Sequence, residues 1–187
     1  MLILASRSPQ RRAILEQLGL PFEVVEPCVE ETTDGEPEAL VSSNALRKAR
    51  SVAAGRSSDR VLGADTAVVL DGDVLGKPVD RAQAEQFLMR LAGSTHEVFS
   101  GIAICHEGIE SSSTAVTRVR MRSLERADIT WYLDTEEWRE RAGGYAIQGR
   151  GAALVEEIAG DFWNVVGLPV PELLRLLGGG FQALRAP

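Results

Sequence analysis

Two patterns of apolar and polar positions alternate along the 187-residue chain: short continuous apolar runs, and segments in which apolar residues recur every three or four positions. Short apolar runs predict strands, and apolar residues three or four positions apart predict helices. The strands expected from this pattern cover residues 2–5, 22–26, 60–70, 74–75, 95–105, 111–124 and 153–158, and residues 143–149 are expected to be a tight strand entry. The expected helices cover residues 9–18, 37–54, 81–92 and 171–177, with another through residues 129–133. The pattern indicates a mixed α/β protein.

Turn and cap residues mark where these elements begin and end. Ser8 is suited to cap a helix whose first position is Pro9, and Gly19 is suited to stop it. An acidic, turn-rich segment at residues 30–36 is expected to be exposed. The sequence contains no internal repeat and no low-complexity linker. We therefore expect one domain over residues 1–187, an α/β fold whose mixed, elongated sheet spans two lobes around a central cleft, with helices on its faces.

Composition narrows the class of protein. Hydrophobic residues make up 44% of the chain and the mean hydropathy is −0.04, values typical of a soluble globular protein. The longest apolar runs fall far below the roughly 20 residues that span a bilayer. A net charge of −7 argues against broad nucleic-acid binding. Two cysteines and the lack of a secretory signal at Met1 favour a reducing, cytoplasmic environment.

The first expected helix offers a site for anions. A strand runs into a short polar loop and then into this helix, so backbone N–H groups and the positive end of the helix dipole face one point. The polar side chains around that point are Ser6, Ser8, Arg11 and Arg12. The alternative is an ordinary strand-to-helix junction whose arginines are solvated.

A carboxylate and a hydroxyl, those of Asp65 and Thr66, interrupt an apolar stretch. A buried carboxylate is costly unless it is paired, bound to metal or functional. Asp65 is therefore a candidate ligand for a hard divalent cation, or a candidate base that deprotonates water. The alternative is an aspartate at a strand end that accepts hydrogen bonds from the backbone.

Three further charged residues, Glu31, Lys48 and Lys77, each have an alternative as a surface charge. Together with Arg11 and Asp65 they form a set of cations and carboxylates. Phosphoanhydride chemistry needs this combination, because cations neutralise phosphate oxygens while carboxylates hold metal and orient water. The chain has no P-loop, no dinucleotide-binding glycine fingerprint and no serine-hydrolase elbow, so those classes are not supported.

Seven motifs follow one another along the chain. They are Leu4–Arg11, Val29–Glu31, Arg47–Ala49, Gly63–Thr66, Gly76–Pro78, Gly144–Gly149 and Val165–Pro169. Together they resemble the Maf family, the septum-formation-inhibitor-like nucleoside triphosphate pyrophosphatases, over nearly the whole chain. The resemblance implies a cytoplasmic homodimer with a central nucleotide cleft and a divalent metal, Mg²⁺, Mn²⁺ or Co²⁺. The reaction it implies is cleavage of a nucleoside triphosphate between the α and β phosphates.

The same resemblance implies which residues form the site. The positions that match are Ser6, Arg11, Glu31, Lys48, Asp65, Lys77 and Gln148. Asp65 matches the family's proton acceptor, and Glu31 and Asp65 are the expected metal ligands. The lysines are expected to act on the phosphates during catalysis.

Three positions bear on which base is selected. Thr66 and Gln148 are similar to the subgroup that acts on dTTP and UTP, whereas Gln10 stands where that subgroup usually has arginine. The Gln148 amide, with one donor group and one acceptor, is able to complement the imide edge of uracil or thymine.

Two other functions stay open. In the first, a regulator of cell division holds a nucleotide in the same cleft without turnover. Asp65 favours catalysis over this alternative, because a pure binder gains nothing from a carboxylate that faces an anion unless a metal intervenes. The second is a purine-analogue pyrophosphatase acting on ITP or XTP, which Thr66 and Gln148 disfavour.

Overall fold

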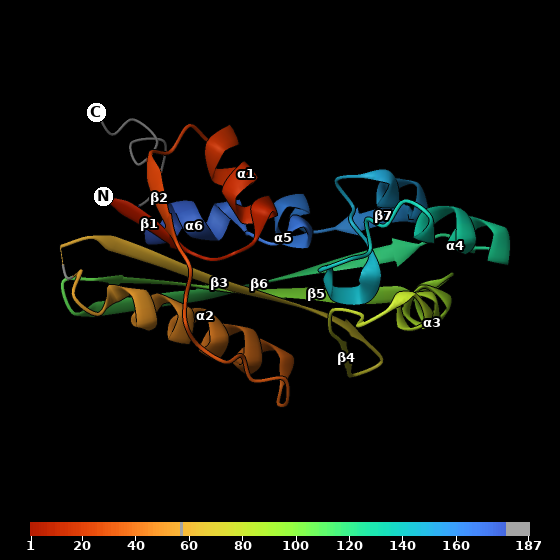
Figure 1. Ribbon diagram of the computed structural model, residues 1–187, viewed down its shortest axis with the longest axis horizontal. Coiled ribbons are helices and arrows are strands. Elements are labelled where there is room, and N and C mark those ends of the chain that lie inside the picture. The colour runs from red at the N-terminus through yellow and green to blue at the C-terminus, as the bar shows by residue number, and fades with distance from the viewer. Residues whose placement is uncertain (57, 179–187) are drawn as a thin grey trace. The chain divides into compact units, whose positions relative to one another are not determined.

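The computed structural model describes residues 1–56 and 58–178, and Figure 1 shows their helices and strands. The strands are β1 (Leu2–Ala5), β2 (Phe22–Val25), β3 (Arg60–Leu70), β4 (Asp73–Leu75), β5 (Thr95–His106), β6 (Ile109–Met121) and β7 (Val155–Ala159). The α-helices are α1 (Pro9–Gln17), α2 (Pro37–Ala53), α3 (Arg81–Leu91), α4 (Arg126–Leu133), α5 (Phe162–Val166) and α6 (Val170–Leu176).

These strands form one seven-stranded sheet in the order β2-β1-β3-β5-β6-β7, with β4 paired to β3. β1 is parallel to both β2 and β3, whereas β4 is antiparallel to β3 and β7 is antiparallel to β6. Parallel neighbours need crossover connections, and α1 and α2 supply them here. The mixed α/β class predicted from the sequence is therefore confirmed.

The described chain divides into two compact units. The first unit holds residues 1–66, residues 100–115 and the described residues from 167 onward, and the second holds residues 67–99 and 116–166. β3, β5 and β6 each contribute residues to both units. Within the described residues, no helix combines the length and the apolar character needed to cross a membrane. The predicted central cleft stays a prediction.

In the first unit, α2 covers one face of the strands while α1 and α6 cover the other (Figure 1). Ala45 and Ala49 of α2 pack against small and branched apolar side chains of the strands, including Val61. The approach is so close that a Cβ on Gly63 would lie 2.1 Å from the Ala45 carbonyl oxygen. Only glycine fits at this point of β3, and polar side chains of α2 can consequently reach the strand.

The second unit has a core of its own. Leu88 and Leu91 of α3 and Tyr132 of α4 are buried there with residues of β3 to β7. On β6, exposed Arg118 and Arg120 alternate with buried Val119 and Met121. These arginines form ion pairs with acidic residues of neighbouring strands, so this face of the sheet is solvated and the basic alternation needs no nucleic acid to explain it.

The structure differs from the expected elements at three places. Residues 143–149 form no strand, because Gly143 and Gly144 have φ values of 70° and 73° and turn the chain out of an extended path. The short helix α5 is not anticipated, since its Phe-Trp-Asn-Val-Val sequence favours strands. It follows a turn in which the Asp161 carboxylate accepts a bond from the Trp163 N–H at 2.9 Å. β6 covers Ile109–Met121, not residues 111–124.

Candidate active site

The Asp65 carboxylate is held on β3, where 9% of the residue is exposed. Asn44 and Lys48 lie one turn apart on α2 and both reach it. Lys48 Nζ donates to Oδ1 of Asp65 at 2.7 Å, and Asn44 Nδ2 donates to Oδ2 at 3.0 Å. Each carboxylate oxygen therefore has a donor, which offsets the cost of burying the charge.

The Lys48 ammonium lies between two carboxylates. Its side chain is only 6% exposed, and Nζ lies 2.7 Å from Asp65 Oδ1 and 2.7 Å from Glu31 Oε1. A third bond, at 3.2 Å, goes to the carbonyl oxygen of Ala64. Three acceptors match the three N–H groups of an ammonium. The structure thus brings together Glu31, Lys48 and Asp65, which the sequence groups for phosphate chemistry. We call these three residues the lysine cluster.

Arg11 lies in the first turn of α1 and is buried. Its Nε donates to the Gly167 carbonyl at 2.9 Å, Nη1 to Ser6 Oγ at 3.3 Å and Nη2 to Thr66 Oγ1 at 3.1 Å. Burial lowers the pKa of Arg11, while the charges of Asp65 and Glu31 oppose that shift. A guanidinium carries five N–H groups, so these three bonds leave part of it for an anion.

The loop before α1 has the cap that the sequence predicts. Ser8 Oγ accepts from the Arg11 backbone N–H at 3.5 Å and donates to Gln10 Oε1 at 3.1 Å. Arg12 does not turn toward this loop: it is exposed and pairs with Glu16, one turn further along α1, at 2.8 Å. Ser6, Ser8 and Gln10 therefore lie beside Arg11, whereas Arg12 lies on the outer face of the helix.

Thr66 belongs to a hydrogen-bond group that sequence reasoning only partly anticipates. Its Oγ1 lies 2.9 Å from Ser100 Oγ and also donates to the Gly167 carbonyl at 3.4 Å. Ser100, the Gly167 carbonyl and Asn44 are all absent from the predicted site. A signal for Asn44 exists in its spacing of four from Lys48 on one helix, whereas Ser100 becomes recognisable only when β5 is placed beside β3.

Two of the predicted residues, Lys77 and Gln148, belong to the second unit. Lys77 Nζ pairs with Glu140 Oε2 at 2.9 Å, and both side chains are exposed. Gln148 is exposed at the end of the segment that begins with buried Tyr145. Their participation in one site with the lysine cluster stays a prediction.

The segment before Gln148 is anchored by a buried aromatic pair. Tyr145 Oη lies 2.8 Å from His96 Nε2, and the two rings meet edge to face with centroids 5.5 Å apart. Burial lowers the pKa of His96 to about 4, so its ring is neutral at pH 7. A neutral imidazole has one donor and one acceptor, which suits it to hold the tyrosine hydroxyl and not to bind an anion by charge.

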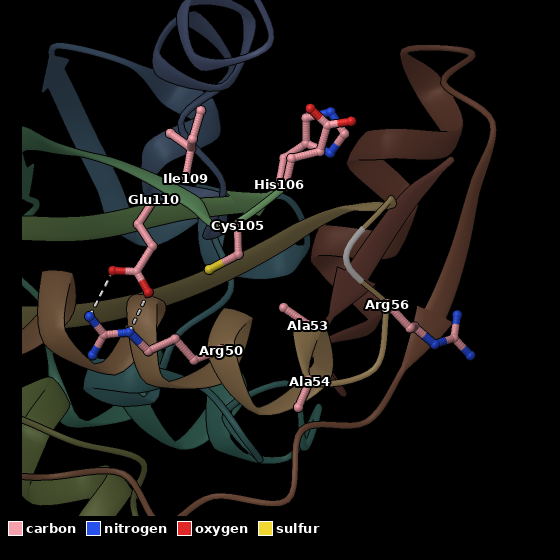
Figure 2. Close-up of a pocket in the computed structure, with 10 residues that line it drawn as sticks. Arg50, Ala53, Ala54, Arg56, Cys105, His106, Ile109 and Glu110 are labelled. Carbon is pink, nitrogen blue, oxygen red and sulfur yellow. Dashed lines mark hydrogen bonds and ion pairs between the residues drawn. The ribbon is translucent and has the colours of Figure 1, made fainter.

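Figure 2 shows a hollow of about 270 Å³ in the first unit, formed by the end of α2 and the β5–β6 turn. Ala53, Ala54 and Cys105 are among the residues that line it, and none of the predicted site residues does. Arg50, which also lines the hollow, donates two hydrogen bonds to Glu110, from Nε to Oε1 at 2.6 Å and from Nη2 to Oε2 at 2.7 Å. Burial raises the pKa of the Cys105 thiol, which disfavours a reactive thiolate.

The donor atoms of the lysine cluster are those that a hard divalent cation prefers. Glu31 and Asp65 offer carboxylate oxygens, the ligands of Mg²⁺ and Mn²⁺, on either side of one ammonium. Among the described residues, no group of three or more His, Cys, Asp or Glu side chains is placed to hold a metal alone. A metal at these two carboxylates would have to take its remaining ligands from water or substrate, as Mg²⁺ commonly does.

Together the fold and this geometry define an α/β protein with a buried ammonium–carboxylate cluster next to a helix N-terminus. The Maf-like protein family matches residues 1–179, so the chain belongs to the Maf family. A dTTP/UTP pyrophosphatase of Symbiobacterium thermophilum is 48% identical, covering 94% of this chain and 92% of that protein. A dTTP/UTP pyrophosphatase of Dictyoglomus turgidum is 46% identical, covering 94% of each. The solved Staphylococcus aureus Ham1 protein is 15% identical over 64% of this chain and 71% of its own, with a TM-score of 0.48.

Proposed function

We propose that this chain is a nucleoside triphosphate pyrophosphatase that hydrolyses dTTP and UTP to the monophosphate and pyrophosphate. The observation that carries the proposal is the buried Lys48 ammonium between the carboxylates of Glu31 and Asp65. The relatives named for this activity support it. A buried ion pair is weak evidence of a role in stability, because apolar residues of similar size stabilise as well or better. The cluster's one ammonium and two carboxylates leave an excess of negative charge, so a triphosphate would approach it together with a divalent cation.

In the proposed reaction, a water oxygen forms a bond to phosphorus at the α–β anhydride, Asp65 takes the water proton, and the bridging oxygen leaves with pyrophosphate. Lys48 neutralises phosphate charge, and Arg11 with Ser6 holds phosphate oxygens beside the first turn of α1. Lys77 supplies a further cation. A divalent metal, Mg²⁺, Mn²⁺ or Co²⁺, would be held by Glu31 and Asp65 and would act as a Lewis acid on the phosphates.

The decisive experiment is a product analysis. Purified protein is incubated with a panel of nucleoside triphosphates and each metal, and the products are identified by phosphorus NMR. We expect dTMP or UMP with pyrophosphate, and only with metal. Release of orthophosphate and a nucleoside diphosphate contradicts the proposal, and tight nucleotide binding without turnover identifies a regulator instead.

Substitution of Asp65 tests the proton acceptor directly. Asp65→Asn keeps the acceptor for Lys48 but loses the base, so we expect turnover to fall by roughly 10² or more with the fold retained. Asp34→Asn, which alters an exposed carboxylate of the acidic segment, is the matched control. Equal turnover in wild type and Asp65→Asn would remove Asp65 from the mechanism.

Base selection is proposed to rest on Gln148, with Thr66 in support. The Thr66 hydroxyl already contacts Arg11 and Ser100, whereas the Gln148 amide is exposed. Gln148→Ala is expected to abolish the preference for dTTP and UTP in kcat/KM. Gln10→Arg, which adds the charge usual in the subgroup, is expected to raise that preference on the order of 10-fold, about one charge-assisted hydrogen bond. An unchanged ratio in Gln10→Arg shows that Gln10 does not reach the nucleotide.

A further inference from the structure

Asn44 makes four hydrogen bonds, and they join three parts of the first unit. Its Nδ2 donates to Asp65 Oδ2 on β3 at 3.0 Å and to the carbonyl oxygen of Thr32 at 2.9 Å. Its Oδ1 accepts from the backbone N–H and the hydroxyl of Thr32, both at 3.0 Å. A side chain on α2 thus binds both a strand carboxylate and the acidic segment at residues 30–36.

The orientation of this amide is fixed by chemistry. A carbonyl oxygen and a carboxylate accept bonds only, so the two hydrogens of Nδ2 must face them. The Thr32 N–H donates only and therefore meets Oδ1. Asn44 is 2% exposed, and the two N–H donors and two lone pairs of its amide are all used. A flipped amide would lose at least three of the four bonds.

The acidic segment is not held by regular secondary structure. Residues 26–36 form no helix or strand, and Glu31 is exposed although its carboxylate reaches Lys48. Glu31 is the neighbour of Thr32, so the residue that anchors Thr32 also sets where the Glu31 backbone lies. In the ion pair between Glu31 and Lys48 the Glu31 side chain is 47% exposed, so water screens this pair more than it screens the buried bonds of Asn44.

Packing of α2 on the sheet does not require this asparagine. The close approach to β3 is made by Ala45 and Ala49 over Gly63, and Asn44 lies beside that contact with its amide toward Asp65 and Thr32. An apolar side chain would avoid the cost of burying an amide. The four satisfied bonds therefore indicate a role in orientation.

We propose that Asn44 is a positioning residue that holds the Asp65 carboxylate and the Glu31 segment in fixed register for the reaction. The inference rests on the proposed function for its effect on turnover, but the anchoring of residues 30–34 is a property of the free protein. Asn44 is not expected to touch the nucleotide or the water.

Two variants separate the two halves of this role. Asn44→Ala removes all four bonds. Asn44→Asp keeps acceptors for the Thr32 N–H and hydroxyl but cannot donate to Asp65 or to the Thr32 carbonyl, and it adds a like charge beside the Asp65 carboxylate. Ser43→Ala, an exposed neighbour on the same helix, is the matched control. Circular dichroism confirms that each variant is folded. If Asn44→Ala does not fold, Thr32→Val takes its place, because it removes only the bond from the Thr32 hydroxyl.

The first measurement is hydrogen exchange at residues 30–34 without nucleotide or metal. In Asn44→Ala the Thr32 amide loses its acceptor, and we expect exchange there to accelerate by at least about tenfold, the scale of one hydrogen bond. In Asn44→Asp this protection should persist. Thr32→Val is expected to give a smaller acceleration. Wild-type exchange rates in Asn44→Ala overturn the anchoring.

The second measurement is the split between kcat and KM for dTTP. Both Asn44 variants are expected to lower kcat by roughly tenfold or more while KM changes little, because the bonds orient reacting groups and do not bind substrate. Equal kcat in Asn44→Ala and wild type overturns the role in the reaction. If the wild type hydrolyses no nucleoside triphosphate, the proposed function fails, and the exchange experiment still decides whether Asn44 anchors the segment.

Discussion

Lys48 and Arg50 stand two residues apart on α2, and both pair with carboxylates at hydrogen-bond distance. The Lys48 side chain is 6% exposed and has Glu31, Asp65 and a carbonyl as partners. The Arg50 side chain is 56% exposed and pairs with Glu110 alone of the described carboxylates. Distances do not distinguish the two sites, since the closest contacts are 2.7 and 2.6 Å. They differ in burial and in the number of partners.

That difference separates a surface pair from a candidate site. The exposed pair raises the pKa of Arg50 and lowers that of Glu110 through their hydrogen bonds, yet water and salt screen it. The buried cluster must keep a cation and a carboxylate out of water, and it does so with bonds from α2, β3 and the acidic segment. A hollow beside the exposed pair (Figure 2) does not turn it into a site.

Removal of the buried cation has the largest expected effect. Lys48→Met keeps the length of the side chain but leaves Asp65 with Asn44 as its remaining side-chain donor among the described residues. We expect kcat/KM to fall by about 10³, the upper range for losing one electrostatic contact. Breaking a buried pair is also expected to lower the free energy of unfolding by about 3 kcal/mol, measured by urea denaturation.

Arg50→Met is the matched control, because it removes a cation from the same helix. The comparison between the two regions fails if Arg50→Met and Lys48→Met lose similar activity.

Added Mg²⁺ or Mn²⁺ sharpens the comparison. Since Lys48 lies between the two carboxylates that fit the metal, Lys48→Met without nucleotide should gain more thermal stability from metal than wild type does.

How far the sequence predicts this fold depends on the range of the interactions involved. β3 begins and ends as predicted because its apolar run is bounded by charged residues and an Asp71-Gly72 turn. Residues 143–149 are mispredicted because Gly143 and Gly144 have positive φ, and at Gly143 the chain passes so close to β3 that a Cβ would lie 3.0 Å from the Val68 side chain. Such long-range contacts leave no local pattern.

The candidate site shows the same limit. Asp65 is predictable because a charge inside an apolar stretch is costly unless it has a function, and Lys48 and Glu31 are predictable because their motifs place them with it. Asn44 is missed because an asparagine on a helix resembles a neutral surface residue until its four partners are known. Arg12 is predicted beside Arg11, but the helix turns it toward Glu16.

Glu31 is intermediate between the two regions in burial. Its side chain is 47% exposed, yet it pairs with the same Lys48 as the buried Asp65. Glu31→Gln keeps an acceptor for Lys48 but removes the charge. We expect a roughly tenfold loss of kcat, smaller than that of Lys48→Met because Asp65 still holds the ammonium, and a higher metal concentration for half-maximal rate. Glu30→Gln, its exposed neighbour, is the control and should behave as wild type.

The smallest effect is expected at the exposed pair. Glu110→Gln should leave kcat/KM for dTTP within about twofold of wild type, because surface substitutions away from a site change little. Arg50 lowers the pKa of Glu110 by hydrogen bonding, so the pair contributes stability above the unfolded pKa of a glutamate, about 4.3, and loses it as the pH falls through the lower folded value. The difference in melting temperature between wild type and Glu110→Gln should thus be small at pH 7, become smaller still as the pH falls below the unfolded pKa, and shrink in 1 M salt. A difference that grows on acidification, or a clear loss of activity, would show that burial is not what separates the two regions.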